Sequence, residues 1–366
     1  MDTERIDISS VNRVIGANLA ANYAWNAAAN WSAISHDAMN GKPVCLSTLP
    51  HATGTPAVVV GSGPSLDKAV ERIGAFPGAV FCGPSQVRTL DRWGRLPDYV
   101  VAIDSNKATA EQLQGPVYSH TILLTHQCID PSVLDLWRWD RRFFRIRITD
   151  GDDLQAAAYP WLRVGFTVQG CTVNAAVQLA AWLGYSPIYL VGVDFGFPDG
   201  KLRATDWHPR GVHAYDRIEP RAAYDAKPSI YTDEADKNRR NGVMRHNGVL
   251  TSHEMMIYRL LLLAVWKSKR LRLWSCSSGI LTELPWVDFD EVTEADYVEG
   301  PYPEGSEIDD IVDRATVPYG LYAEHGGKIV NAGDLCARQD ELEEELRLVH
   351  ERVARWDQVN GVWSRS

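Results

Sequence analysis

Three groups of residues have types and spacing that could do chemistry: a glycine-rich turn, polar residues at the ends of strands, and several histidines. The turn "GSGPSL" directly follows the apolar run "AVVV". Where a strand passes through a tight turn into a helix, backbone N–H groups converge and the helix dipole favours negative charge. Gly63 lets a ligand approach the backbone, and Pro64 suits the first helical position. The turn is therefore predicted to bind a phosphate through Gly61, Ser62, Gly63, Pro64 and Ser65.

Two common uses of such a turn do not fit these residues. A P-loop requires Gly-Lys-Ser/Thr, and the turn has no lysine. The dinucleotide fingerprint requires a third glycine, where this chain has Leu66, and an acid after the second strand, where it has Cys82 followed by Gly83. NAD is therefore disfavoured. A purely structural role for the turn stays open.

Polar and acidic residues follow several other apolar runs. They are Ser85 and Gln86, then Asp104, Ser105 and Asn106, and finally Asp194. In an open α/β sheet, ligands bind beyond the carboxyl ends of the strands, so these side chains are expected to contact a ribose and a base. Helix capping is the alternative for Ser85 and Asp104, and one residue can do both.

The elements that must position these residues alternate regularly along the chain. Apolar runs predict strands at 57–61, 79–83, 99–104, 121–126, 143–148, 187–196 and 271–276. Helices are predicted at 10–45, 65–73, 85–94, 131–139, 172–184 and 254–267, with a short one ending at 114. The order predicts an α/β, Rossmann-like fold: a parallel sheet with helices on both faces.

Two segments interrupt this alternation. Residues 197–250 are polar and lack clear periodicity, which predicts a lid-like insert. The predicted organisation is a helical flanking segment at 1–50, a nucleotide-binding catalytic domain at 51–296, a linker at 297–336 and a C-terminal helix at 337–366. That helix is amphipathic and suits packing or self-association into a homo-oligomer.

Composition narrows the functional classes. The net charge of −10 argues against broad electrostatic binding of nucleic acid. The six cysteines lie far apart, which favours reduced thiols in a cytoplasmic protein. The start "MDTERIDISS" is unlike a signal peptide, and the most apolar run, 255–266, is too short to span a bilayer. No membrane association is expected.

Four motifs in order then carry a resemblance to a known family. They are "GSGPSLD", "LPDYVVAID", "QGCTVNAAVQLAAWLGYSPIYLVGVDFGFPDGK" and "NGVLTSHEMMIYRLL". Together they resemble the domain shared by motility accessory factor glycosyltransferases and the archaeal hydroxymethyldihydropterin pyrophosphokinase. That domain is similar in fold to bacterial sialyltransferases that use CMP-sialic acid. The likeness covers roughly residues 40–290.

The resemblance implies a set of nucleotide-binding residues. In the sialyltransferase-like members the glycine turn binds the cytidine nucleotide, helped by an Asn-Gln pair whose place Ser85-Gln86 fills. The segment Gln169, Gly170, Cys171 and Thr172 matches a turn that contacts nucleotide and donor sugar, and Asp194 matches the acid that ends the "GxDF" strand. Ser62 departs from the family, which has Asn within the turn.

A catalytic histidine precedes the late helix in these relatives. Here His246 and His253 both lie near that place, and the insert adds His208 and His213. The resemblance therefore implies a histidine base without choosing among the four. A histidine of near-neutral pKa can take the proton of an acceptor hydroxyl.

Three functions follow. The first is a glycosyltransferase that moves a sugar, such as a nonulosonic acid, from a CMP-activated donor to a hydroxyl of a protein, a glycan or modified DNA, with no cofactor required. The second is pyrophosphoryl transfer from ATP to a pterin-like alcohol, with Mg²⁺ held by Asp104 and Asp194. The acidic run at 150–153 offers further carboxylates. The third is a non-catalytic nucleotide-binding or assembly module.

Overall fold

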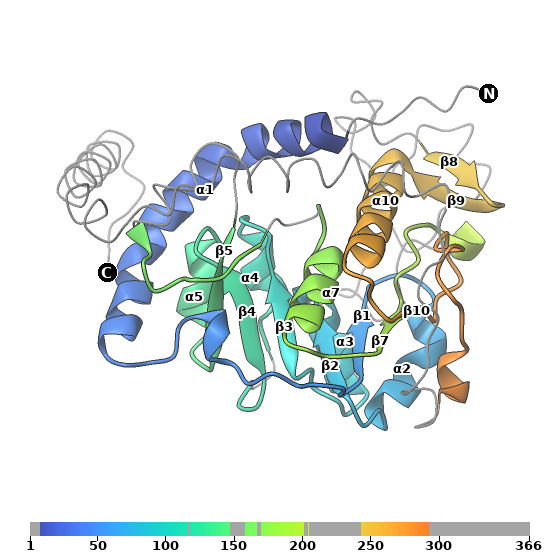
Figure 1. Cartoon of the computed structure of the whole chain (residues 1–366), viewed down its shortest axis with the longest axis horizontal. Coiled ribbons are helices and arrows are strands. Elements are labelled where there is room, and N and C mark those ends of the chain that lie inside the picture. The colour runs from blue at the N-terminus through green and yellow to red at the C-terminus, as the bar shows by residue number, and fades with distance from the viewer. Residues whose placement is uncertain are drawn as a thin grey trace.

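A computed structural model gives the architecture of the chain and describes residues 8–115, 118–146, 158–166, 170–200, 204 and 243–292. Strands and helices alternate around one parallel sheet (Figure 1). The strands of this sheet are β1 (Ala57–Val60), β2 (Ala79–Cys82), β3 (Tyr99–Ala102), β4 (Ile122–His126), β5 (Arg141–Ile146), β6 (Gly165–Phe166), β7 (Ile188–Val191) and β10 (Leu273–Ser275). Their spatial order is β10-β7-β1-β2-β3-β4-β5-β6, and every pairing is parallel. The predicted Rossmann-like α/β fold is confirmed.

The helices are mostly those that the sequence predicts. They are α1 (Ile8–Met39), α2 (Leu66–Gly74), α3 (Val87–Arg92), α4 (Ala108–Gln112), α5 (Pro131–Leu136), α7 (Thr172–Trp182) and α10 (His253–Ser268). Short 3₁₀ turns are η1 (Leu46–Thr48), η2 (Pro84–Gln86), η3 (Pro198–Gly200) and η5 (Phe289–Glu291). Side-chain caps fix some of the helix starts: Asp130 accepts from the Ser132 N–H ahead of α5, and Ser252 accepts from the Met255 N–H ahead of α10.

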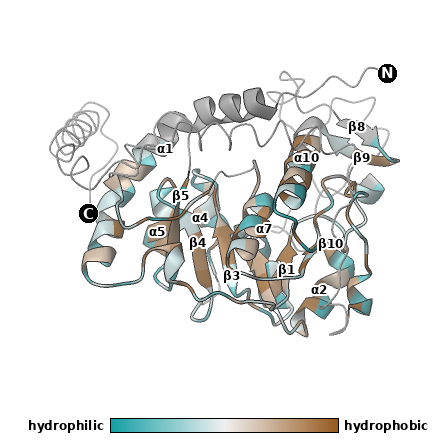
Figure 2. Cartoon of the chain, in the orientation of Figure 1, coloured by the Kyte–Doolittle hydropathy of each residue, from teal (hydrophilic) through white to brown (hydrophobic). Residues whose placement is uncertain are grey.

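The strands are buried on both faces, so each strand contributes alternate residues to two separate cores (Figure 2). On one face Val58, Val80 and Val100 pack with residues of α2, α3, α4 and α5. On the other face Val59 and Phe81 pack with α7 and α10. This double burial explains why the strands appear in the sequence as continuous apolar runs.

Helix α1 contacts α5 and lies along the molecule in Figure 1. Two of its asparagines, one turn apart, satisfy main-chain carbonyls of loops that follow β3 and β4. The amide of Asn26 donates to the carbonyls of Ser105 (2.9 Å) and Cys128 (3.1 Å). The amide of Asn30 donates to those of Gln127 (3.0 Å) and Ile129 (2.7 Å). The "ANYAWNAAANW" segment is therefore an integral part of the fold.

We expect Asn30→Ala to lower the free energy of unfolding by about 1–3 kcal/mol, because two buried carbonyls would lose their donor. Asn40→Ala is the matched control, since Asn40 is exposed at the helix end and donates locally to the His36 carbonyl. Urea unfolding of both variants measures the difference. Equal stabilities of the two variants would contradict the structural role of Asn30.

His126, at the end of β4, is a structural histidine. Its Nδ1 accepts from the Cys128 N–H (3.1 Å), and its Nε2 then donates to the Ile103 carbonyl (2.8 Å). Burial lowers the pKa of this imidazole to about 4, although the bond to Ile103 opposes the shift. His126 is therefore neutral at physiological pH and fully committed to the loops after β3 and β4.

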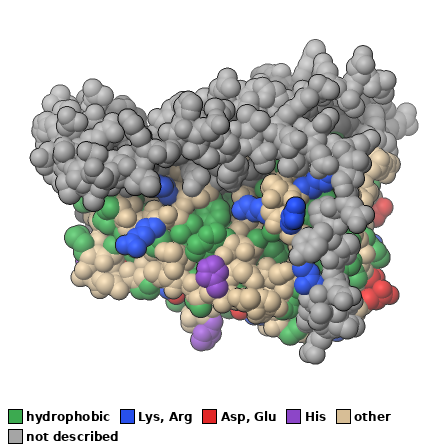
Figure 3. All heavy atoms as spheres, viewed as in Figure 1, with side chains coloured by type: hydrophobic (Ala, Val, Ile, Leu, Met, Phe, Trp, Pro, Cys, Tyr) green, Lys and Arg blue, Asp and Glu red, His purple; other side chains and the backbone are tan. Residues whose placement is uncertain are grey.

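The predicted insert contains a hairpin that the periodicity missed. Strands β8 (Val243–His246) and β9 (Val249–Ser252) pair antiparallel, and a bridge joins Phe197 to Leu250. The rest of the insert between 205 and 242 lies outside the described residues, as do the acidic run at 150–153, the predicted linker and the C-terminal helix. No helix in the described ranges combines the length and apolar character that crossing a bilayer requires. On the described surface in Figure 3, Lys and Arg are scattered and do not form one continuous stripe.

Candidate functional site

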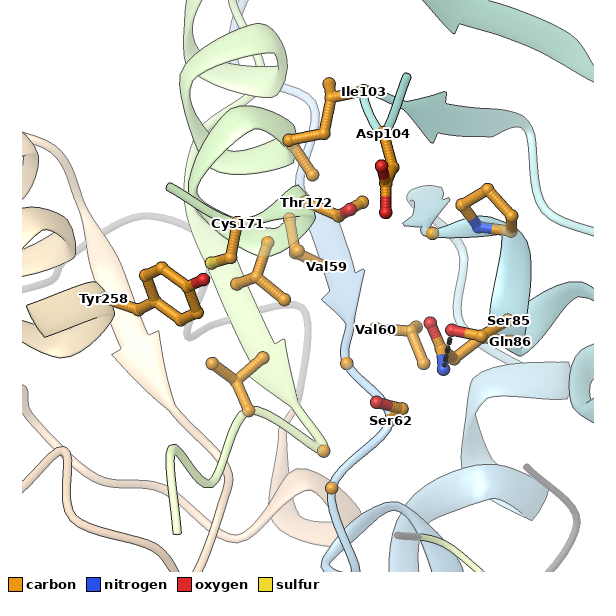
Figure 4. Close-up of a pocket in the computed structure, with 18 of the residues that line it drawn as sticks. Val59, Val60, Ser62, Ser85, Gln86, Ile103, Asp104, Cys171, Thr172 and Tyr258 are labelled. Carbon is orange, nitrogen blue, oxygen red and sulfur yellow. Dashed lines mark hydrogen bonds between the residues drawn. The ribbon is translucent and has the colours of Figure 1, made fainter. Parts of the chain in front are cut away.

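A cavity of about 380 Å³ lies beyond the carboxyl ends of β1, β2, β3 and β7 (Figure 4). Helix α4, the first turn of α7 and two side chains of α10, Met255 and Tyr258, also line it. In Figure 4 Tyr258 and Cys171 stand on one side of the opening, and Ser62, Ser85 and Gln86 stand on the opposite side. Its volume falls within the range of small-molecule sites.

The cavity coincides with the point where the strand order of the sheet reverses. From β1 the chain continues outward through β2 to β6, and then returns to place β7 on the other side of β1. The loops that leave β1 and β7 therefore diverge, which opens a crevice at this edge of the sheet. Open α/β sheets bind their ligands at such a switch point.

The glycine turn lines this cavity, yet several of its amides are bonded within the chain. The Gly61 N–H donates to the Val191 carbonyl and the Gly63 N–H to the Gly192 carbonyl, both at 2.8 Å. The Ser65 N–H donates to Oδ2 of Asp194 at 2.9 Å. A carboxylate of the chain therefore occupies the start of α2, where the sequence predicted a ligand phosphate.

The two glycines of the turn are required by packing against the loop after β7. A Cβ atom on Gly61 would lie 2.3 Å from the Gly192 carbonyl oxygen, and one on Gly63 would lie 2.2 Å from Asp194 Oδ2. Real Cβ atoms do not approach so closely, so neither site accepts a side chain without movement of the backbone or of the carboxylate. On the sequence alone, Gly63 is expected to let a ligand approach the backbone closely, but in the structure the carboxylate of Asp194 makes this close approach.

Asp194 is the most perturbed acid of the site. It lines the cavity but is only 2% exposed. Burial raises its pKa to about 6, against the opposing effect of the hydrogen bond from the Ser65 N–H. Strongly perturbed carboxyl groups in a crevice mark candidate functional sites. Near neutral pH this group can exchange a proton.

The residues after β2 and β3 present small polar groups to the same cavity. Gln86 is buried in η2, and its Nε2 donates to Ser85 Oγ at 2.8 Å (Figure 4). Asp104 Oδ1 accepts from the Asn106 N–H at 3.3 Å, and Asn106 Oδ1 accepts from the Ala108 N–H at 2.9 Å. These bonds form local turns ahead of α4, whose N-cap residue Lys107 makes no side-chain capping bond, and Asp104 and Asn106 also line the cavity. Ser85 makes no capping bond at η2.

Helix α7 begins at the cavity wall. Cys171, Thr172 and Val173 line the cavity, and Cys171, the residue before the helix, makes no side-chain capping bond. The first turn of α7 contains no acid. Asn174 donates to the Tyr258 carbonyl at 2.9 Å and so ties α7 to α10. The start of α7 is thus a positive helix end that faces the cavity.

The charges of the described lining are negative. Asp104 and Asp194 line the cavity, and no Lys, Arg or His does so among the residues that the structure describes. Within the same described ranges, no three His, Cys, Asp or Glu side chains gather to hold a metal ion. Two carboxylates suit Mg²⁺ that takes its remaining ligands from water and from phosphates of a substrate.

The structure brings most of the predicted binding residues together. Those that line the cavity are Gly61, Ser62, Gly63, Ser85, Gln86, Asp104, Asn106, Cys171, Thr172 and Asp194. Pro64, Ser65, Ser105 and Gly170 are near it in the chain but do not form its lining. Ser105 instead offers its carbonyl to Asn26, and Gly170 lies against the ring of Tyr258. Gln169 is outside the described residues.

The structure does not place any of the four candidate histidines in the described lining of the cavity. His208 and His213 are outside the described residues, and His253 is the first residue of α10. His246 lies on β8 and is not part of the described lining. Burial and the positive charge of Arg259 lower its pKa, and its buried Nε2 has no hydrogen-bond partner within the described chain. His246 is therefore neutral and able to accept a proton.

Sequence reasoning missed the parts of the lining that come from α4 and α10. Met255 and Tyr258 lie three residues apart in α10, while Thr109 and Gln112 lie three apart in α4. Side chains at this spacing share one helix face. The spacing was visible in the sequence, but "MMIYRLLLLAVW" has apolar residues on every face, so nothing marked Tyr258 as a cavity residue.

Comparisons with known proteins give two similarities. Residues 38–200 match the model of the MptE-like family, described as 6-hydroxymethylpterin diphosphokinase MptE-like. Among solved structures, the chain is similar to the MAf glycosyltransferase from Magnetospirillum magneticum AMB-1, with 20% identity and a TM-score of 0.48. That similarity covers 80% of this chain and 46% of the solved one. No curated protein matches. The resemblance indicated by the four motifs is thus confirmed for residues 38–200, the segment that matches the MptE-like family.

Proposed function

We propose that this protein is a nucleotide-dependent transferase whose donor binds in the cavity at the carboxyl ends of β1, β2, β3 and β7. The observation that carries the proposal is the convergence of small polar residues from four strand ends at the switch point of the sheet. In this proposal Ser85 and Gln86 hydrogen-bond a base, while Asp104 and Asn106 bind ribose hydroxyls.

The donor phosphate, in this proposal, faces the start of α7. The amides of Gly63 and Ser65 already bond to Gly192 and Asp194, so the start of α2 offers fewer donors than a free anion site would. The first turn of α7 carries no competing acid and lines the same cavity. Backbone N–H groups there would stabilise negative charge as it develops on a leaving phosphate.

The favoured reaction is sugar transfer from a CMP-activated donor, in the manner of the sialyltransferases that the motifs resemble. An acceptor hydroxyl attacks the anomeric carbon, the bond to the donor phosphate breaks, and a histidine takes the hydroxyl proton. His246 has the required neutral state, and His253, His208 and His213 are the other candidates. The proposed acceptor is a hydroxyl of a protein or a glycan, or of modified DNA.

Diphosphoryl transfer is the second candidate, and two observations favour it. Residues 38–200 match a family described as a 6-hydroxymethylpterin diphosphokinase. The described lining also has carboxylates and no cation, which suits a triphosphate that arrives with Mg²⁺. Asp104 and Asp194 would hold the ion, which would neutralise charge on the phosphates.

A panel of nucleotides separates these functions. We expect CMP to raise the melting temperature equally in EDTA and in Mg²⁺, and ATP, UDP and GDP to have smaller effects. Stabilisation by ATP alone, and only with Mg²⁺, would instead favour the diphosphoryl reaction and contradict the CMP-dependent one. Absence of any shift with every nucleotide would favour a non-catalytic module and contradict both reactions.

Asp104→Ala should weaken binding of the nucleotide identified in this panel by roughly 10-fold or more, because a hydrogen bond to a charged group contributes about 1.5–3 kcal/mol. Asp135→Ala is the matched control, since Asp135 is exposed on α5 and lies outside the cavity. Titration calorimetry gives both dissociation constants. Equal affinity of the two variants would place the nucleotide elsewhere.

A further inference from the structure

A second cavity, of about 370 Å³, lies near the amino end of β5, on the side of the sheet opposite to the carboxyl ends of the strands. The end of α1, the segment before η1, the end of α5 and the start of β5 form its walls. It therefore lies at the amino end of a strand, whereas the first cavity lies beyond the carboxyl ends. None of the motifs discussed above contributes to it, and no residue lines both cavities.

Its lining is rich in positive charge, in contrast to the first cavity. Lys42, Arg138, Arg141 and Arg142 line it, together with two carboxylates, Asp37 and Asp140. The lining thus carries a net charge of +2, in a chain whose net charge is −10. A local excess of this kind attracts anions.

Most of these charged groups are held in fixed positions. Asp37 accepts from Lys42 Nζ at 2.7 Å and from Arg141 Nη2 at 2.6 Å. Arg142 is buried, pairs with Asp140, and donates from Nε to Thr48 Oγ1 at 3.0 Å. A preorganised set of donors loses little conformational entropy when an anion binds.

Arg138 differs from the other three cations. It is exposed, and within the described part of the chain it makes neither a hydrogen bond nor an ion pair. Its planar guanidinium can therefore offer two parallel N–H groups to an oxyanion, a geometry that suits phosphate.

Aromatic rings supply an apolar wall beside these cations. Trp137 is buried and stacks on Tyr118, with ring centroids 4.4 Å apart. Trp139 is half-buried and meets both rings edge-on, at 5.3 Å from Tyr118 and 5.8 Å from Trp137. Pro43 and Val44 add apolar surface. Such a wall packs against the ring or the carbon skeleton of a ligand.

We propose that this second cavity binds a small phosphate monoester. At neutral pH such a group carries a charge near −2, which matches the excess of the lining, whereas a simple carboxylate carries −1. Arg138 and Lys42 bind the phosphate, and the indole of Trp139 packs against the attached sugar or ring. The site goes beyond the proposed transferase reaction and does not depend on it.

Titration calorimetry of the full chain with ribose 5-phosphate tests the proposal, with ribose as the uncharged reference. We expect saturable binding of ribose 5-phosphate, no binding of ribose, and weaker binding at higher salt. Arg138→Ala should weaken the binding of ribose 5-phosphate at least 10-fold. The double variant with Trp139→Ala should bind it more weakly still. Neither substitution removes a hydrogen bond within the described structure.

Two controls locate the ligand. Arg163→Ala removes an exposed arginine outside both cavities and should leave the affinity unchanged. Asp104→Ala alters the first cavity and should also leave it unchanged. Loss of ribose 5-phosphate binding in Asp104→Ala, retention in Arg138→Ala, or absence of binding to the unaltered chain would each overturn the proposal. If inorganic phosphate bound as tightly as ribose 5-phosphate, that result would contradict the proposed packing of the Trp139 indole against the sugar.

Discussion

Replacement of Gly61 by alanine should lower the free energy of unfolding by about 3 kcal/mol and abolish nucleotide binding in the first cavity. The added Cβ would lie 2.3 Å from the Gly192 carbonyl oxygen and 2.9 Å from its carbon. These are backbone atoms of the neighbouring loop and cannot rotate away. The ends of β1 and β7 would have to separate, which breaks the bond between the Gly61 N–H and the Val191 carbonyl.

Gly74→Ala is the matched control for this substitution. Gly74 ends α2, the helix that follows the turn, and a Cβ there would come no closer than 3.7 Å to the Trp93 carbonyl oxygen. Alanine is a better helix former than glycine, so stability should stay constant or rise slightly. Urea unfolding measures both variants. If Gly61→Ala proved as stable as Gly74→Ala, that result would contradict the inference that the loops after β1 and β7 leave no room for a Cβ atom at position 61.

Replacement of Asp194 by asparagine should have the opposite effect on stability. The folded protein raises the pKa of Asp194 from 3.8 to about 6 because the carboxylate is buried. Between pH 4 and pH 6 the folded chain keeps this proton while the unfolded chain loses it, so the free energy of unfolding falls as pH rises. Above pH 6 the accumulated loss is about 3 kcal/mol. An asparagine stays neutral and its Oδ1 can still accept from the Ser65 N–H.

We therefore expect Asp194→Asn to be more stable than the unaltered chain by up to about 3 kcal/mol at pH 7.5, with the gain shrinking to nothing near pH 4. Chemical unfolding of both proteins at a series of pH values measures the difference between their free energies of unfolding. Contributions from other titrating groups, such as His126, are the same in both proteins and cancel in this difference. Asp135→Asn, at an exposed position, should show no such trend. A variant destabilised equally at both pH values would contradict the raised pKa.

The same substitution reports on function. If Asp194 serves the proposed reaction, Asp194→Asn should be more stable and yet bind or turn over the nucleotide less well, since functional sites often retain groups that weaken the fold.

Much of the fold was predictable because its strands are buried on both faces. β1, β2, β3 and β7 appear as unbroken apolar runs between turn residues, and the structure confirms each of them. The bounds of β1, β2 and β3 are slightly shorter than predicted, whereas β7 keeps only Ile188–Val191 of the predicted 187–196. The hairpin β8–β9 was missed because its strands mix polar and apolar residues. A local signal was nevertheless present, since "NG" at 247–248 adopts the left-handed conformations that a two-residue hairpin turn requires.

The sequence predicts a residue of the candidate site only where its position directly after a strand puts it at the carboxyl edge of the sheet. Residues that follow strands reach one edge of the sheet whatever else they do, so Ser85, Asp104 and Asp194 could be placed there from the sequence. The direction of a side chain depends on contacts between distant segments. The bond from Ser65 to Asp194 joins residues 129 positions apart, and no periodicity in the chain reveals it.

The asparagines of α1 have a consequence for where the folding unit begins. Four carbonyls in the loops after β3 and β4 depend on amides at positions 26 and 30, and Tyr159 donates its hydroxyl to the Ala27 carbonyl. A fragment cut at residue 51, where the alternation of strands and helices starts, would leave these groups without their partners. The smallest piece of chain that keeps its own hydrogen bonds therefore starts ahead of Asn26, inside the helix that the sequence pattern sets apart as a flank.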